Sequence, residues 1–150
     1  MSKHKKEFKE IYIKNLVEGI IENFAYNQKD IKFDTDIEDI QVTGDEEQWT
    51  TVFENIIDNG LRYAKSLIRI NIYEDNDKQY ITIYNDGEKI PEDKLENIFW
   101  TFNKGKGGNF GLGLDIVKRI VSMYNGSIKA QNEDDGVSFI IVIRETGPIS

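Results

Sequence analysis

The sequence of 150 residues predicts an α/β fold: a two-layer sandwich in which about three helices cover one face of a mixed β-sheet. Two observations lead to this prediction. Some stretches repeat apolar residues at helical spacing, whereas others alternate and are rich in β-branched and aromatic residues. The two kinds of stretch follow one another in an order that favours antiparallel strands packed against helices.

The individual elements can be assigned in chain order. Apolar positions from Phe8 onward recur at helical spacing and predict a first helix to about Tyr26. Asp45 can cap a second helix, because Glu46 and Glu47 then lie at its positive end. The expected elements are a helix over 8–26, short strands over 32–36 and 40–43, a helix over 45–64, a hairpin of strands over 67–73 and 79–84, a short helix begun by Pro91, a helix after residue 111, and a hairpin of strands over 127–131 and 137–144.

Length and composition restrict the class of protein. We expect one domain with a core over about 8–144 and flexible ends. The absence of cysteine excludes disulfides and thiolate chemistry, and a single histidine, His4, excludes a histidine-clustered zinc site. A net charge of −8 disfavours nucleic acid as a partner. Neither a membrane-spanning run nor a secretory signal is evident, so we expect a soluble, cytoplasmic polypeptide.

A glycine-rich segment precedes the last helix. Residues 103–110 contain three glycines and two lysines, Lys104 and Lys106, with little that could be buried. The segment runs into Gly111–Leu114 (GLGL), where helical spacing begins. A helix N-terminus attracts anions through its free N–H groups and its dipole. This arrangement predicts a basic lid over a nucleotide phosphate.

Two further polar groups interrupt apolar elements. Asn55 and Asn59 lie four residues apart, so they project from one face of the second helix, close to Arg62 and Tyr63. They are either solvated surface residues or ligands, with Asn59 offering an oxygen to Mg²⁺ and Arg62 meeting a phosphate. Residues 85–87 (NDG) end a strand; they form a turn, or they supply an oxygen that accepts the amine of adenine.

The two usual nucleotide-binding motifs are not present. The segment GLGLDI lacks the third glycine of the dinucleotide fingerprint and does not follow a strand directly. No phosphate-binding G-x-x-x-x-G-K-[ST] occurs either. The sequence therefore favours a different nucleotide-binding fold.

The order of the motifs identifies such a fold. The segments ENIIDNGLRYA (54–64), NDGEKIP (85–91), IFWTF (98–102) and GLGL (111–114) occur in this order within about 8–144. This series resembles the catalytic and ATP-binding domain of sensor histidine kinases. That domain has the Bergerat fold and belongs to the superfamily that includes gyrase B subunits and the Hsp90 chaperones.

The resemblance implies a role for particular residues. Asn55 and Asn59 match the two asparagines of the N box, and Asn59 is the expected magnesium ligand. Phe99 and Phe102 match the F box that anchors the lid. Glu54 is a candidate for orienting or deprotonating the attacking group, although a solvated charge is the simpler interpretation. The nucleotide-binding residues implied by the resemblance are Asn55, Asn59, Arg62, Tyr63, Asn85, Asp86, Gly87, Ile90, Phe102, Lys104, Lys106, Gly111, Leu112, Gly113 and Leu114.

The sequence departs from the family at the adenine motif. Where the family usually reads Asp-x-Gly-x-Gly-Ile, this chain places Asn85 at the aspartate and Lys89 at the second glycine. Asp86 could take the aspartate's place only by a shift of one residue. An asparagine oxygen can accept the adenine amine, but without the charge that strengthens such a bond. Val137 also stands where a threonine is common after the glycine.

The resemblance implies that this chain binds ATP and Mg²⁺ and transfers the γ-phosphate to a histidine on a separate helical dimerisation domain. His4 is interpreted as an incidental terminal residue and not as that phosphoacceptor. A response regulator is the expected partner downstream, and this fragment is expected to be a monomer, from a kinase that can be anchored in the membrane. The alternatives are a serine kinase of the anti-sigma type and a non-catalytic interaction domain of the same fold.

Overall fold

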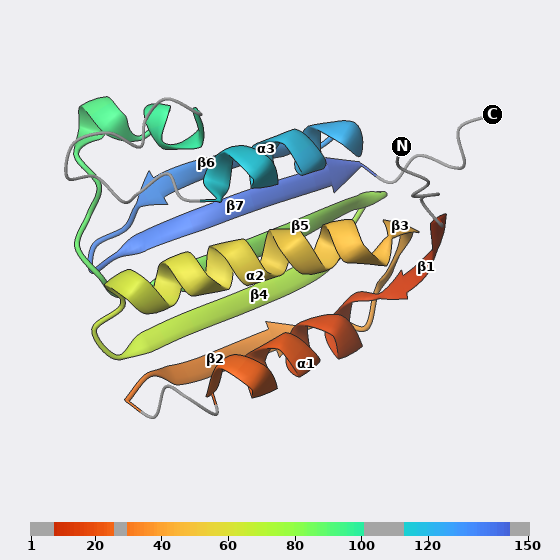
Figure 1. Cartoon of the computed structure of the whole chain (residues 1–150), viewed down its shortest axis with the longest axis horizontal. Helices are drawn as coiled ribbons and strands as arrows, with labels where there is room; N and C mark the ends of the chain where they lie inside the picture. Colours follow the sequence, from red (N-terminus) through yellow and green to blue (C-terminus); the bar gives the residue numbers. More distant parts are fainter. Residues whose placement is uncertain (1–7, 26–29, 101–112, 145–150) are drawn as a thin grey trace, which may run out of the picture.

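The computed structural model describes residues 8–25, 30–100 and 113–144, which form two layers (Figure 1). One layer holds three helices, α1 (Ile13–Ala25), α2 (Glu46–Tyr63) and α3 (Leu114–Met123). The other is a five-stranded sheet with strand order β2-β4-β5-β7-β6, in which β2 is parallel to β4 and the other neighbours are antiparallel. Its strands are β2 (Lys32–Ile37), β4 (Leu67–Asp75), β5 (Lys78–Asn85), β6 (Ser127–Asn132) and β7 (Val137–Arg144). The predicted two-layer sandwich is confirmed.

The prediction of one helix from Phe8 to about Tyr26 is wrong at its start. Residues Phe8–Tyr12 form strand β1, which pairs antiparallel with β3 (Gln41–Asp45) in a separate two-stranded sheet. Ile11 is buried on this ribbon, and its partner across the strands is Val42. The segment is short, and its single inward residue fits a helical or a strand period equally well. Pairing with a strand 30 residues further along the chain therefore decides the structure.

The core lies between the helices and the five-stranded sheet. Alternate residues of β4 and β5, such as Ile68, Ile70 and Ile81, point at the helices and are fully buried. Helix α2 meets them with Trp49, Phe53, Ile56 and Ile57, also fully buried. Burial of each such side chain contributes about 1.5–3 kcal/mol. Helix α2 crosses the middle of the sheet in Figure 1, so the core fixes its position.

The start of α2 is held by specific hydrogen bonds. The side chain of Asp45 accepts hydrogen bonds from the N–H groups of Glu47 and Gln48, at 2.9 and 3.3 Å, as the sequence predicts. The hydroxyl of Tyr124, after α3, accepts from the Asp45 N–H at 3.0 Å and donates to Gln48 Oε1 at 2.6 Å. These bonds join the start of α2 to the end of α3.

The connections match the predicted turns closely. The β4–β5 hairpin turns at Asn76 and Asp77, whose φ values of 51° and 66° are those of a type I′ turn. After β5, Pro91 precedes the short helix η1 (Glu92–Lys94), and a second short helix, η2 (Asn97–Phe99), follows. The loop 86–91, which connects β5 to η1, lies beside the carboxyl end of α2 (Figure 1).

Candidate nucleotide site

A small cavity lies where the second half of α2, the end of β5 and the following loop meet. Its volume is about 10 Å³, close to what one water molecule needs. Both polar and apolar side chains line it. The lining residues are Asn59, Tyr63, Asn85, Glu88, Ile90, Val137 and Phe139. Four of them, Asn59, Tyr63, Asn85 and Ile90, are predicted nucleotide-binding residues.

Asn59 faces this cavity from α2. The residue is only 6% exposed, although most buried polar side chains are hydrogen-bonded. No side-chain hydrogen bond joins it to any other residue in the described part of the chain. Its amide oxygen is therefore available to a ligand that enters the cavity.

Asn55 lies one turn earlier and faces a different neighbour. Its amide nitrogen donates to the carbonyl oxygen of Thr51 at 2.7 Å, which leaves the oxygen free to face α3. That oxygen lies against Gly113, where a methyl group would overlap it. Gly113 precedes α3 with φ at 80°, a left-handed conformation that favours glycine. The structure thus brings Asn55 to the N-terminus of α3.

Arg62 and Tyr63 occupy the last turn of α2. The Arg62 side chain is exposed and makes a long contact of 3.9 Å with Asp58, an exposed ion pair that contributes little to stability. Tyr63 is partly buried at the cavity; burial raises the pKa of its hydroxyl, and the charge of Arg62 opposes this. Arg62 can therefore turn toward an anion at small cost.

The structure separates the roles of Asn85 and Asp86. Asn85 is buried at the cavity, and its side-chain oxygen accepts from the Gly87 N–H at 2.9 Å. The carboxylate of Asp86 instead accepts hydrogen bonds from the N–H groups of Lys65, Ser66 and Leu67, at 2.8, 3.0 and 3.1 Å, and from the Ser66 hydroxyl at 2.8 Å. Partial burial tends to raise the pKa of Asp86, but these hydrogen bonds lower it to about 2. Asp86 thus fixes the turn after α2.

The loop after Asn85 packs closely against its surroundings. A methyl group on Gly87 would overlap the carbonyl oxygen of Tyr63, so the loop touches the end of α2 here. Lys89 is exposed and does not have a positive φ, so its replacement of the family's second glycine causes no backbone strain. Ile90 is buried, and both of its backbone groups bond to the side chain of Asn132.

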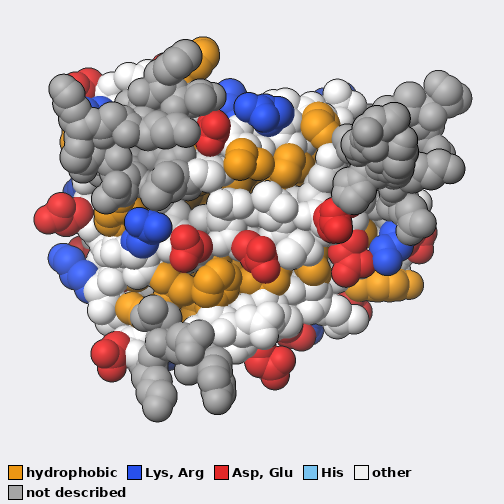
Figure 2. Space-filling view, in the orientation of Figure 1, with side chains coloured by type: hydrophobic (Ala, Val, Ile, Leu, Met, Phe, Trp, Pro, Cys, Tyr) orange, Lys and Arg blue, Asp and Glu red, His pale blue; other side chains and the backbone are white. Residues whose placement is uncertain are grey.

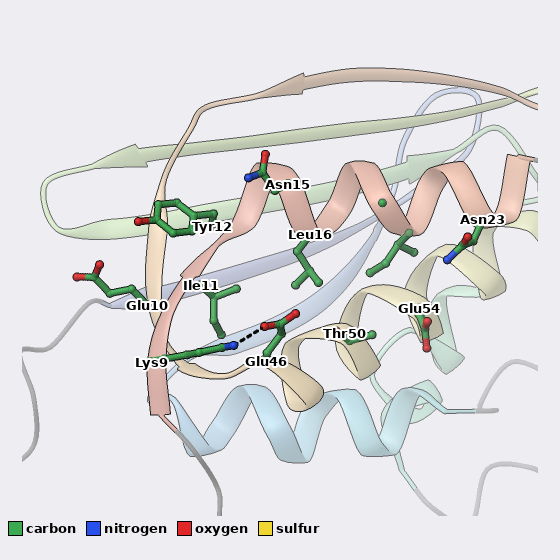
Figure 3. Close-up of a pocket in the computed structure, with 12 residues that line it drawn as sticks. Lys9, Glu10, Ile11, Tyr12, Asn15, Leu16, Asn23, Glu46, Thr50 and Glu54 are labelled. Atoms are coloured by element: carbon green, nitrogen blue, oxygen red, sulfur yellow. Dashed lines mark ion pairs between the residues drawn. The ribbon is translucent and has the colours of Figure 1, made fainter.

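Glu54 does not join the other predicted residues. It lies on another face of α2 and lines a groove of about 560 Å³ between α1, α2 and β1 (Figure 3). Figure 3 shows it at the Asn23 end of this groove, away from the ion pair of 2.9 Å between Lys9 and Glu46. Glu54 is exposed and is therefore a surface charge in this structure. On the same helical face, Figure 2 shows hydrophobic side chains in a band between α1 and α2, with acidic side chains beside it.

The lid and F-box predictions are only partly covered by the structure. Phe99 is buried and meets Phe139 edge to face, with ring centroids 6.3 Å apart, which connects the F box to the cavity wall. Leu114 is fully buried at the start of α3. Outside the described residues lie His4, Phe102, Lys104, Lys106, Gly111 and Leu112.

Several lining residues were not predicted from the sequence. Val137 and Phe139 belong to a strand pattern that any buried strand shows, and Glu88 lies in a polar loop. Asn132 contacts a residue 42 positions away, so no local pattern indicates it. Within the described ranges, no group of three Asp, Glu, His or Cys side chains could hold a metal ion, and no helix is long and apolar enough to cross a membrane.

Comparisons with known proteins identify the family of this chain. A sequence profile of the family described as histidine kinase-, DNA gyrase B- and HSP90-like ATPases matches residues 44–147. The sensor histidine kinase CssS of Bacillus subtilis is 38% identical over 144 residues, which cover 95% of this chain and 32% of CssS. The heme sensor protein HssS of Staphylococcus epidermidis is 33% identical over 137 residues, 87% of this chain and 30% of HssS. The chain spans about a third of the length of these relatives.

Solved structures show the same fold. The nucleotide-free catalytic domain of histidine kinase ThkA superposes with a TM-score of 0.83 and 30% identity, covering 93% of this chain and 97% of the ThkA domain. ThkA in complex with the response regulator protein TrrA gives a TM-score of 0.78 at 24% identity, over 93% of this chain and 42% of that one. The predicted Bergerat fold is confirmed, and the profile matches well over half of the residues. This chain belongs to the family of histidine kinase-, DNA gyrase B- and HSP90-like ATPases.

Proposed function

We propose that this chain is the catalytic and ATP-binding domain of a sensor histidine kinase, and that ATP binds at the cavity between α2 and the loop 86–91. The buried Asn59 amide, which has no hydrogen-bond partner among the described residues, is the observation that carries the proposal. The amide oxygen of Asn59 is therefore available to bind a ligand at the cavity. The relatives named sensor histidine kinases favour this activity over a serine kinase of the anti-sigma type.

Adenine would occupy the buried end of the site. Asn85 lies there, and its oxygen already accepts one hydrogen bond from Gly87, which leaves a second lone pair for the adenine amine. Asp86 is held by the 65–67 turn, so it is the weaker candidate. The cavity of about 10 Å³ is smaller than a purine, so side chains that line it have to move outward when the base enters.

The phosphates would lie toward α3. Asn55 directs its oxygen at Gly113, and the N–H groups that follow Gly113 have no partner within the helix, as at any helix N-terminus. Arg62 lies at the other side of Asn59 and can meet a phosphate. The predicted contacts from Lys104, Lys106, Gly111, Leu112 and Phe102 complete this part of the proposal.

The residues present fit Mg²⁺. Asn59 offers one oxygen, and Mg²⁺ usually binds through one or two protein ligands, several waters and the substrate phosphates. Once bound, the ion would offset the charge of the phosphates. The chain itself would orient the nucleotide, exclude water from its buried end and leave the γ-phosphate exposed to an incoming histidine.

The remaining partners follow from the chemistry. The histidine would come from a helical dimerisation domain, and the phosphate would pass from it to a response regulator, as the complex of ThkA with TrrA suggests. We propose that this region alone is a monomer, because dimerisation in such kinases belongs to the helical domain. ATP is a cytoplasmic nucleotide, so the domain would work in the cytoplasm, within a kinase that can be anchored in the membrane.

Substitution of Asn59 tests the metal assignment. Calorimetric titration with a non-hydrolysable ATP analogue should show binding that Mg²⁺ strengthens in the original chain. In Asn59→Ala, the strengthening by Mg²⁺ should disappear and affinity should fall by about tenfold or more, which is a loss of at least about 1.4 kcal/mol.

Asn23→Ala is the matched control, because it removes an exposed helical asparagine far from the cavity. It should bind the analogue as the original chain does. An Asn59→Ala protein that is folded and binds the analogue with unchanged dependence on Mg²⁺ would overturn the assignment.

A further inference from the structure

A single side chain outside the predicted motifs holds the loop 86–91. Asn132 Oδ1 accepts from the Ile90 N–H at 2.9 Å, and Asn132 Nδ2 donates to the Ile90 carbonyl at 2.8 Å. These are the two bonds that a neighbouring strand residue would make, yet here one amide side chain makes both. An amide side chain presents an acceptor and a donor together in this fixed arrangement.

The sheet register places Asn132 beside the cavity. Asn132 pairs with Val137 across β6 and β7, and Val137 pairs with Asn85 across β7 and β5. Directly paired residues point to the same face of a sheet, so the three side chains form one row on the helical face. Val137 and Asn85 line the cavity, and Asn132 reaches from the end of the row to the backbone of Ile90, which also lines it.

The hairpin that carries Asn132 is itself fixed against Asn85. The Glu133 N–H donates to the Gly136 carbonyl at 2.8 Å and closes the turn between β6 and β7. A methyl group on Gly136 would overlap the carbonyl oxygen of Asn85, so the hairpin lies in direct contact with the end of β5. Asn132 is thus anchored on the same side as the proposed adenine acceptor.

We infer that Asn132 is a positioning residue for nucleotide binding: its side-chain amide anchors the backbone of Ile90, and with it the loop 86–91, beside the proposed adenine site. The inference rests on the proposed nucleotide site. Asn132 does not touch the base; it acts through the backbone of Ile90. Without it, the loop loses both bonds and the buried wall of the site is no longer fixed.

The test compares Asn132→Ala, Asn132→Asp and the control Gln131→Ala, which lies on the opposite, exposed face of β6. The affinity for ADP is measured by calorimetry from pH 8 to pH 4, relative to the original chain at each pH. Asn132→Ala should weaken binding by about tenfold at every pH, because two hydrogen bonds are lost. Gln131→Ala should have no effect.

Asn132→Asp provides a readout that a general loss of structure would not produce. An ionised carboxylate can accept from the Ile90 N–H but repels the Ile90 carbonyl, so binding should be weak at pH 8. A protonated carboxyl both accepts and donates, so affinity relative to the original chain should begin to recover as pH falls toward the ordinary aspartate pKa of about 3.9. Asn132→Ala, which carries no titrating group there, should show no such recovery.

Amide hydrogen exchange of Ile90 in the nucleotide-free proteins separates this inference from the proposed function. Its N–H should exchange slowly in the original chain and at least about tenfold faster in Asn132→Ala. Failure of the original chain to bind ADP would contradict the proposed function, and the exchange result would still decide whether Asn132 holds the loop. Equal exchange rates, or ADP binding by Asn132→Ala at original strength, would overturn the inference.

Discussion

Residues of similar chemistry that lie close together in the sequence make different contacts in this site. Asn55 and Asn59 are four residues apart on α2, yet Asn59 faces the cavity whereas Asn55 faces the start of α3. Asn85 and Asp86 are adjacent, yet one lines the cavity and the other fixes the turn after α2. The sequence predicted that all four lie near a nucleotide. It could not assign Asp86, because its partners at 65–67 are about 20 residues away.

The structural role of Asp86 can be tested through stability. Its pKa is lowered from 3.8 to about 2, so its contribution is present above pH 4 and is lost as pH falls toward 2. Urea unfolding at pH 7 should show that Asp86→Asn lowers the free energy of unfolding by about 1–2 kcal/mol, after screening at this partly exposed group is allowed for. At pH 2, the difference from the original chain should be largely gone.

Asp39→Asn is the control for this experiment, since Asp39 is an exposed loop residue with the same change of charge. It should alter stability by less than about 0.5 kcal/mol. A loss in Asp86→Asn that stays constant from pH 7 to pH 2, or one no larger than in Asp39→Asn, would contradict the structural role.

The sequence predicted the ends of helices better than the pairing of strands. The start of α2 was predicted at Asp45 because its cap is local in sequence. Strand β1 was missed because its partner β3 lies 30 residues further along, and a short apolar pattern does not reveal a distant partner. The bonds from Asn132 to Ile90 were missed for the same reason. Local signals were thus predictable and long-range pairings were not.

Replacing each of two glycines, one within α1 and one just before α3, by alanine should change the free energy of unfolding in opposite directions. Gly19 lies within α1 with no atom within 4 Å of an added methyl group, so Gly19→Ala should raise the free energy of unfolding by about 0.5–1 kcal/mol. Gly113 has φ at 80°, and an added methyl group would overlap Asn55, so Gly113→Ala should lower it by about 1–3 kcal/mol.

Urea unfolding of both variants at pH 7 measures these effects, and each serves as the control for the other. Gly113→Ala should also weaken binding of a nucleotide analogue, because Asn55 and the start of α3 are forced apart, whereas Gly19→Ala should bind normally. Equal stability changes in the two variants would contradict the described contact between Asn55 and Gly113.

In the whole molecule, helix α2 is packed on the sheet, and the proposed site lies at one end of this frame. Helix α2 supplies Asn59, β5 supplies Asn85, and the β6–β7 hairpin holds the loop between them. The sequence predicted the layers and the order of the elements, since both follow from local periodicity. It could not predict how narrow the cavity is, because its volume depends on residues from four elements.

We propose that the site between α2 and the end of the sheet binds ATP with Mg²⁺. The most direct measurement is calorimetric titration of the original chain with a non-hydrolysable ATP analogue, with and without Mg²⁺. We expect saturable binding of one nucleotide per chain, strengthened by Mg²⁺. Absence of binding at millimolar nucleotide, in protein shown to be folded, would contradict it.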